Sequence, residues 1–175
     1  AIQNGIHVVV GTTGFDESKL NLLKSMLSKH SKVGALIAPN FGLGAVLMMQ
    51  FSQTAAKYFE SVEIVEMHHA HKVDAPSGTA IRTAEMITAA RKQSKKPAMP
   101  DSTKSEIAGA RGGKVGDVPV HSIRSHGYVA HQEVIFGDLG ETLTIRHDSI
   151  NRAGFMPGVL IGIRNVAKNP GLTVR

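Results

Sequence analysis

The sequence predicts a short parallel α/β piece followed by an α+β domain that is built on a largely antiparallel or mixed sheet. Two buried strand patterns flank one amphipathic helix pattern near the start of the 175-residue chain, which is the order of a βαβ unit. Longer helix patterns follow, and three strand patterns lie close together after residue 117. Because the first piece is too small to form a domain alone, we expect it to be the C-terminal end of a doubly wound sheet.

The α/β piece is expected over residues 1–38. The β-branched run at 6–10 predicts a buried strand that ends in a glycine turn, and the apolar run at 33–38 predicts a second strand. Asp16 and Glu17 between them are typical of a helix start, because acidic side chains favour the positive end of a helix. Leucines three and four positions apart then form the apolar stripe of that helix.

The α+β domain is expected over residues 39–168. Its first helix begins near Leu43, and Ser77 is a suitable N-cap for another helix that ends near Arg91. Residues 93–117 are rich in Lys, Pro, Ser and Gly and predict a long surface loop. The other expected elements are strands at 62–68, 118–125, 129–137 and 141–147, the last two as a hairpin, and a closing helix at 156–168.

The chain is basic, with a formal net charge of +6 and a pI of about 9.7. Such a charge suits a nucleic acid, an anionic surface or a small acidic substrate. The basic residues are scattered, aromatic residues make up only 5% and tryptophan is absent, which disfavours a nucleic acid. No run approaches the roughly 20 apolar residues of a membrane span, the start lacks a signal-peptide pattern, and there is no cysteine. We therefore expect a cytoplasmic protein with no membrane partner.

The densest group of candidate functional residues precedes the helix that Ser77 caps. Three histidines and a lysine lie within the range 68–72, just ahead of the Ser-Gly-Thr helix start at 77–79. The N–H groups in the first turn of a helix and its positive end suit a carboxylate or a phosphate. Histidine supplies a proton donor near neutral pH, and Lys72 supplies a positive charge or a second donor. This combination predicts a site that binds an acidic molecule and protonates it.

A metal site is the competing chemistry for the same residues. His69 and His71 share a face of an extended strand, and Glu66 or Asp74 could add an oxygen ligand. Lys72 in the middle would repel a cation, and no second ligand cluster occurs in the sequence. We therefore expect no metal.

Purely structural roles are also open to these residues. A lone histidine at a strand end is more often structural than catalytic, and most serine N-caps are only caps. The adjacent His68 and His69 would also point to opposite faces of a regular strand. If both serve one pocket, the strand must end or bulge between them.

The segment 66–80, Glu-x-His-His-x-x-Lys-x-Asp-Ala-Pro-Ser-Gly-Thr-Ala, resembles the signature of the dihydrodipicolinate reductase family. Further segments resemble that family in the same order and extend the resemblance over nearly the whole chain: 10–15, 38–41, 127–131, 140–147 and 151–155. The resemblance implies an oxidoreductase of lysine and diaminopimelate biosynthesis. Its substrate would be 4-hydroxy-tetrahydrodipicolinate, a small cyclic dicarboxylate that takes a hydride from NADH or NADPH at C4 as water is lost.

The resemblance also implies roles for individual residues. His68 would be the general acid/base, and Lys72 a second proton donor or charge stabiliser. The substrate carboxylates would be bound by His69, Ser77, Gly78 and Thr79. The nicotinamide end of the cofactor would be bound by Gly11, Thr12, Thr13, Ala38, Pro39, Asn40, Phe41, Arg152 and Phe155. Residues 11–13 could instead form a plain turn, but their place after a parallel strand favours a ligand-binding role.

The same resemblance implies a Rossmann-like nucleotide domain at 1–38, a substrate-binding and oligomerisation domain at 39–168 that forms a homotetramer, and a return towards the nucleotide domain at 169–175. The family's glycine-rich phosphate loop has no counterpart, because the glycine-rich stretch 109–116 follows no predicted strand. We therefore expect an N-terminally truncated family member, with the residues that select NADH or NADPH outside the sequence. The alternative is a non-catalytic fragment that keeps the substrate-binding and oligomerisation roles.

Overall fold

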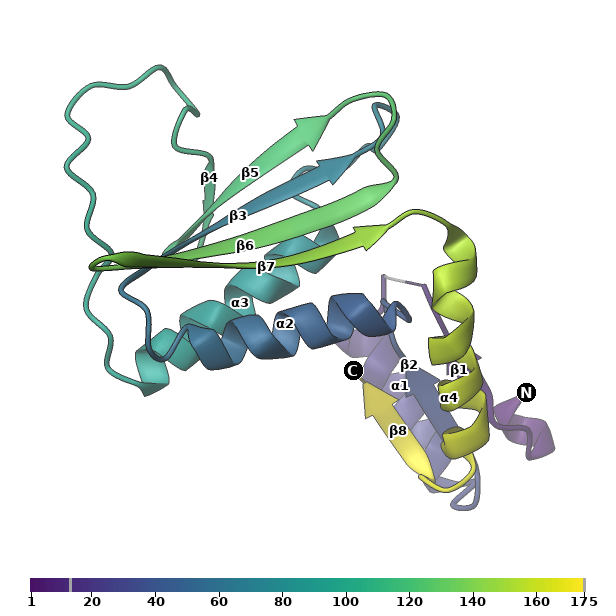
Figure 1. The fold of residues 1–175 in the computed structure, drawn as a ribbon. Helices are drawn as coiled ribbons and strands as arrows, with labels where there is room; N and C mark the ends of the chain where they lie inside the picture. Colours follow the sequence, from purple (N-terminus) through teal and green to yellow (C-terminus); the bar gives the residue numbers. More distant parts are fainter. Residues whose placement is uncertain (13, 175) are drawn as a thin grey trace. The chain divides into compact units, whose positions relative to one another are not determined.

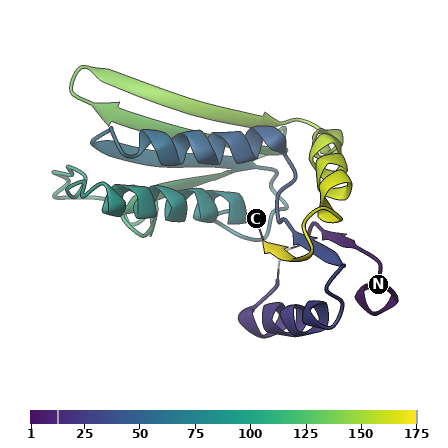
Figure 2. The same ribbon diagram turned by 90° about the horizontal axis from the view of Figure 1, so that it is seen from below.

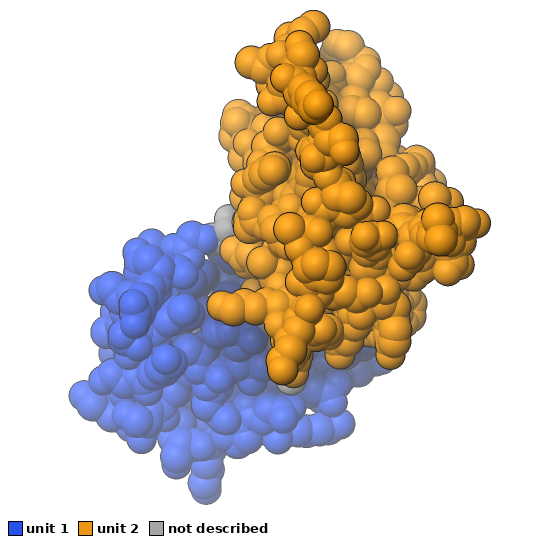
Figure 3. All heavy atoms as spheres, turned by 90° about the vertical axis from the view of Figure 1, so that its left-hand side faces the viewer, with its two compact units in different colours: residues 1–43, 152–175 blue, residues 44–151 orange. Residues whose placement is uncertain are grey.

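The computed structural model describes residues 1–12 and 14–174, and it forms two compact units. Unit 1 consists of residues 1–43 and 152–175, and unit 2 consists of residues 44–151 (Figure 3). The elements of unit 1 are η1 (Ile2–Asn4), β1 (Val8–Val10), α1 (Glu17–Ser28), β2 (Gly34–Ile37), η2 (Arg152–Phe155), α4 (Met156–Val166) and β8 (Gly171–Val174).

Unit 1 is a small parallel sheet with one helix on each face (Figure 2). Its strand order is β1-β2-β8, and both strand pairs are parallel. Side chains alternate between the faces, so Ala35 packs in the core that also holds Leu27 of α1, whereas Leu36 contacts α4 at Gly162. The predicted βαβ unit is confirmed, with Asp16 as the N-cap of α1.

Helix α4 approaches β2 and the segment after it through glycines. A Cβ at Gly158 would lie 2.0 Å from the carbonyl oxygen of Phe41, and one at Gly162 would lie 3.0 Å from Leu36 Cδ2. We expected residues 156–168 in the second domain, but the structure groups α4 with unit 1. The physical reason is this glycine-lined helix face, which packs on the parallel sheet.

Unit 2 is a mixed sheet of order β4-β5-β3-β6-β7 with two helices on one face (Figure 1). Strand β3 lies at its centre, parallel to β5 and antiparallel to β6. Apolar side chains of β3, including Ile64, pack with Ile87 and other residues of the helices in a single core cluster. Its elements are α2 (Leu43–Ala55), β3 (Ser61–His68), α3 (Gly78–Gln93), β4 (Gly113–Val115), β5 (Val118–Arg124), β6 (Ala130–Asp138) and β7 (Glu141–Ser149).

Several details of unit 2 confirm the prediction and others extend it. Ser77 caps α3, and β6 and β7 form the expected hairpin. The predicted loop 93–117 contains β4, a short edge strand that pairs only with β5 among the described strands. Within the described residues no helix is both long and apolar enough to cross a bilayer.

Candidate functional site

The site is organised at the carboxyl end of the central strand β3. Alternation along the strand places Ile64, Glu66 and His68 on the face that α2 and α3 cover. The ladder stops at His68, where β5 ends at Arg124 and β6 begins at Ala130. The strand therefore ends between His68 and His69. Both histidines can serve one pocket only if the strand ends or bulges between them, so this geometry allows it.

Glu66 is a fully buried carboxylate that several donors surround. Arg124 binds it with both terminal nitrogens, Nη1 to Oε2 at 2.9 Å and Nη2 to Oε1 at 2.7 Å. His68 contacts Oε2 through Nδ1 at 2.5 Å, and the backbone N–H of Ser77 donates to Oε1 at 3.1 Å. The side chain of Glu66 has no exposed surface, so its charge depends on these partners.

The electrostatics keep Glu66 ionised. Burial alone raises the pKa of a carboxyl group, but the hydrogen bonds from His68, Arg124 and Ser122 outweigh it and lower the pKa of Glu66 to about 2. An ionised carboxylate can only accept hydrogen bonds. Nδ1 of His68 must therefore carry the proton of their shared hydrogen bond, which leaves Nε2 for other chemistry.

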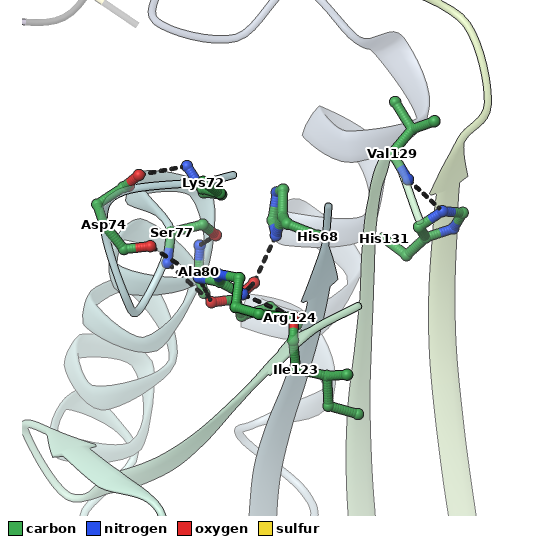
Figure 4. Close-up of polar contacts among 10 residues, drawn as sticks. His68, Lys72, Asp74, Ser77, Ala80, Ile123, Arg124, Val129 and His131 are labelled. Carbon is green, nitrogen blue, oxygen red and sulfur yellow. Dashed lines mark hydrogen bonds and ion pairs between the residues drawn. The ribbon is translucent and has the colours of Figure 1, made fainter. Parts of the chain in front are cut away.

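The turn after β3 carries Lys72 and is held at both ends. The Lys72 backbone N–H donates to the carbonyl oxygen of His69 at 3.1 Å, and its Nζ donates to Asp74 Oδ1 at 2.6 Å (Figure 4). Arg124 Nη2 also donates to the carbonyl oxygen of Asp74 at 2.7 Å. The hydrogen bond from Lys72 is the main cause that lowers the pKa of Asp74, so this carboxyl group also stays ionised.

The start of α3 completes the candidate site in unit 2. Ser77 Oγ accepts the Ala80 backbone N–H at 3.2 Å, so the serine acts as a cap. Gly78 and Thr79 occupy the first turn, at the positive end of the helix. A Cβ added at Gly78 would meet none of the described atoms within 4 Å, so this side of the helix start is open. The arrangement suits a carboxylate group.

The carboxylate oxygens that were considered as metal ligands, those of Glu66 and Asp74, are bound by basic side chains. Glu66 is bound by Arg124, and Asp74 is bound by Lys72. The rings of His69 and His71 lie 6.5 Å apart between centroids. Among residues 1–12 and 14–174, no three His, Cys, Asp or Glu side chains are grouped so that they could hold a metal ion.

Sequence reasoning missed Arg124 and assigned Glu66 only as a possible metal ligand. One signal was present in the sequence: Glu66 lies two residues before His68 in a strand pattern, so the two side chains share a face. Arg124 gave no such signal, because its position beside Glu66 depends on the parallel pairing of β3 with β5.

The predicted cofactor residues lie in unit 1, after its first two strands. Gly11 and Thr12 follow β1, and residues 38–41 follow β2, so both segments lie at the carboxyl edge of the parallel sheet. This is the edge at which open α/β sheets bind ligands. The Ala38 backbone N–H donates to the carbonyl oxygen of Val10 at 2.9 Å and ties the two segments together. Thr13 lies outside the described residues.

Phe41 packs closely against Gly11 at this edge. A Cβ at Gly11 would lie 3.0 Å from Cε2 of Phe41, so only a glycine there lets the phenyl ring lie against the backbone without displacement. Asn40 Oδ1 accepts the Gly42 backbone N–H at 2.8 Å and closes the turn that holds Phe41. Arg152 and Phe155 belong to η2 in the same unit.

Comparisons with known proteins match nearly the whole chain. The family described as "Dihydrodipicolinate reductase, C-terminus" matches residues 44–174, and "Dihydrodipicolinate reductase, N-terminus" matches residues 1–41. The 4-hydroxy-tetrahydrodipicolinate reductase of Mycolicibacterium gilvum is 60% identical over 99% of this chain and 70% of its own length. The protein of the same name from Cutibacterium acnes is 58% identical over 99% of this chain and 71% of its own length.

A solved structure agrees with these matches. The dipicolinate-bound dihydrodipicolinate reductase from Paenisporosarcina sp. TG-14 is 44% identical and superposes with a TM-score of 0.85, over 99% of this chain and 64% of that chain. The matches cover both units, and the relatives are named as enzymes, which favours the reductase over the non-catalytic alternative. The chain belongs to the dihydrodipicolinate reductase family.

Proposed function

We propose that this chain reduces 4-hydroxy-tetrahydrodipicolinate to tetrahydrodipicolinate with NADH or NADPH, as an oxidoreductase of lysine and diaminopimelate biosynthesis in the cytoplasm. One observation carries the proposal: His68, oriented by a buried carboxylate, lies at the end of β3, and the capped start of α3 is joined to the same carboxylate. A proton donor beside an anion-binding helix start is what the protonation of a dicarboxylate requires.

The dicarboxylate is proposed to bind at the start of α3. The N–H groups of Gly78 and Thr79, the Thr79 hydroxyl and the ring of His69 would bind its carboxylates, with Ser77 capping the helix below them. The bound dipicolinate named for the Paenisporosarcina relative, itself a cyclic dicarboxylate, supports a site of this chemistry.

His68 and Lys72 are proposed to handle protons. His68 Nδ1 is held by Glu66, so Nε2 is the atom that would exchange a proton with the substrate. Lys72 would be the second donor or would stabilise developing charge, and Asp74 keeps its ammonium group at the site until the substrate binds.

The nicotinamide cofactor, when bound, supplies the hydride. Its nicotinamide end would be held by Gly11, Thr12, Thr13, residues 38–41, Arg152 and Phe155. Phe41 would lie beside the cofactor. Its ring packs against Gly11, where the lack of a side chain leaves room for it. Both NADH and NADPH fit this proposal, since they share the nicotinamide group.

Binding of 2,6-pyridinedicarboxylate, measured by calorimetry, tests the substrate site. We expect His69→Ala and Thr79→Ala each to weaken binding by about tenfold, because each removes a hydrogen bond to a charged group. Thr88→Ala is the matched control, since Thr88 lies further along α3 and bonds Asp117. Unchanged affinity in both site variants would contradict the placement.

Steady-state kinetics test the proton donors. We expect His68→Gln and Lys72→Ala to lower kcat by about 10²–10⁴-fold and to change KM less, because proton donors act mainly in the transition state. His30→Gln, in the turn after α1, serves as the control. Near-normal turnover in both variants would remove the two residues from the mechanism.

Copies of the chain are proposed to assemble as a homotetramer through the sheet face of unit 2 that α2 and α3 leave open. Val65, Ile123 and Ile135 lie on this face, and Ile123 is 40% exposed. Light scattering is expected to give four times the chain mass of 18.6 kDa. A monomer at micromolar concentration would refute this assembly.

A further inference from the structure

We propose that Glu66 and Arg124 are the positioning pair of the site: together they fix the tautomer of His68 and join the Lys72 turn and the start of α3 to the end of the sheet. This inference rests on the proposed function, because it says which residues would hold His68, Lys72 and the helix start in place for that reaction. Neither residue is proposed to touch the substrate.

The first step of the argument is the connectivity of Glu66. Its Oε2 receives His68 Nδ1 at 2.5 Å, and its Oε1 receives the backbone N–H of Ser77 at 3.1 Å. One carboxylate thus joins the proposed proton donor to the proposed carboxylate site. Its side chain has no exposed surface, so it acts on a ligand only through these neighbours.

The second step is the shape of Arg124. Its two terminal nitrogens bind both oxygens of Glu66, and Nη2 also donates to the carbonyl oxygen of Asp74 at 2.7 Å. Asp74 in turn holds Lys72 Nζ at 2.6 Å. Arg124 therefore positions the lysine turn relative to β3. A lysine at 124 would keep the charge but would lose the planar fork that makes these contacts at once.

The third step is the tautomer of His68. A buried carboxylate only accepts, so it holds the ring with a proton on Nδ1 and turns Nε2 towards other partners. A glutamine at position 66 has an NH₂ group that can donate to Nδ1 instead. The neutral ring then carries its proton on Nε2. Nε2 has no free lone pair in that tautomer, so it cannot take up a further proton to pass on to the substrate.

The chain contains a matched control on the other face of the same strand. Glu63 Oε2 contacts His121 Nε2 at 2.7 Å, and Glu63 Oε1 accepts from Arg111 Nη2 at 2.5 Å. Glu63 thus has one histidine and one arginine partner, as Glu66 does, but none of the proposed site residues is a partner of Glu63 in the contacts that the structure describes. Glu63→Gln removes the same kind of group without touching the proposed proton donor or carboxylate site. Because Glu63 lies on the sheet face proposed for assembly, light scattering must show that this variant assembles as the unaltered protein does.

The experiment compares Glu66→Gln, Arg124→Lys and Glu63→Gln with the unaltered protein. Ring ¹⁵N chemical shifts of His68, recorded at alkaline pH, report which nitrogen carries the proton. We expect Nδ1–H in the unaltered protein, in Arg124→Lys and in Glu63→Gln, and Nε2–H in Glu66→Gln. We expect Glu66→Gln to lower kcat by roughly 10–100-fold, the usual effect of losing a group that orients a functional histidine.

Arg124→Lys separates the two parts of the proposal. The carboxylate remains, so the tautomer should persist, but the turn and the helix start lose their common anchor. We expect the affinity for 2,6-pyridinedicarboxylate to fall by about tenfold. Glu63→Gln should change neither the His68 tautomer nor the affinity.

Amide NMR spectra of each variant show whether it is folded. If Glu66→Gln does not fold, Glu66→Asp replaces it. Glu66→Asp keeps a carboxylate, so His68 should retain Nδ1–H, with weaker binding of 2,6-pyridinedicarboxylate.

Three results would overturn the proposal: Nε2–H in the unaltered protein, Nδ1–H retained in Glu66→Gln, or equal losses in Glu63→Gln. The tautomer readout does not depend on activity. If His68→Gln has normal turnover, the proposed function loses its acid/base, whereas the ring ¹⁵N shifts still decide whether Glu66 sets the tautomer.

Discussion

Strand β3 carries two glutamates with similar partners, one on each face of the sheet. Glu66 binds His68 and Arg124 on the face that the helices cover, and Glu63 binds His121 and Arg111 on the open face. The side chain of Glu66 is fully buried, whereas that of Glu63 is 33% exposed. The two groups show that burial and connection, rather than composition, distinguish a candidate site from a surface ion pair.

The connections differ as much as the burial does. Glu66 also receives the Ser77 N–H and so joins the strand end to a helix start. Glu63 is joined through Arg111 to Asp101, within the long segment between α3 and β4. For Glu63, burial raises the pKa, but hydrogen bonds from His121 and Arg111 outweigh it and lower the pKa below its usual value. Both carboxyl groups are therefore charged at neutral pH.

The largest expected difference between the two groups is in stability. Glu66→Ala leaves the Arg124 guanidinium partly buried and unpaired, and breaking a buried pair costs about 3–5 kcal/mol of unfolding free energy. Glu63→Ala removes a partly exposed pair, which is worth about 0–1 kcal/mol. Urea unfolding followed by circular dichroism measures both. Equal losses would mean that burial does not distinguish the two groups.

The acid limb of the stability curve gives a somewhat smaller effect. Because the pKa of Glu66 is lowered to about 2 in the folded state, its stabilisation is present above the usual value of 4.5 and is lost as the pH falls from 4.5 towards 2. We expect Glu66→Gln to flatten this part of the curve and Glu63→Gln to leave most of it. Urea midpoints at pH 2.5, 3.5, 4.5 and 6 test this, and an acid limb that is as steep in Glu66→Gln as in the unaltered protein would contradict it.

Salt dependence gives the smallest expected effect. Charges near solvent are screened strongly by salt, and buried charges are screened much less. The destabilisation of Glu63→Gln, below about 1 kcal/mol, should shrink further in 1 M NaCl, while that of Glu66→Gln should stay the same. Unfolding free energies at low and high salt provide the measurement. A salt-sensitive Glu66→Gln would show that solvent reaches the buried pair.

The local parts of this site could be predicted from the sequence, and the non-local parts could not. The Ser77 cap and the strand before His68 were predicted because each depends on a few neighbouring residues. The pairing of Arg124 with Glu66 depends on two strands that lie side by side although 58 positions separate the residues. The same limit applies to β8, since its partner β2 lies far earlier in the chain. The roles of the individual site residues remain predictions.

The parallel pairing of β2 with β8 has a consequence for the order of folding. Unit 1 is discontinuous, and its β2–β8 ladder joins residues 34–37 to residues 171–174, so it cannot form until residues 171–174 have left the ribosome. Every strand pair of unit 2 lies within residues 61–149. Closing the longer loop costs more entropy, so the inserted unit should fold first and bring the two halves of the parallel sheet together. Pulse-labelled hydrogen exchange would then show protection in β3 and β6 before β2.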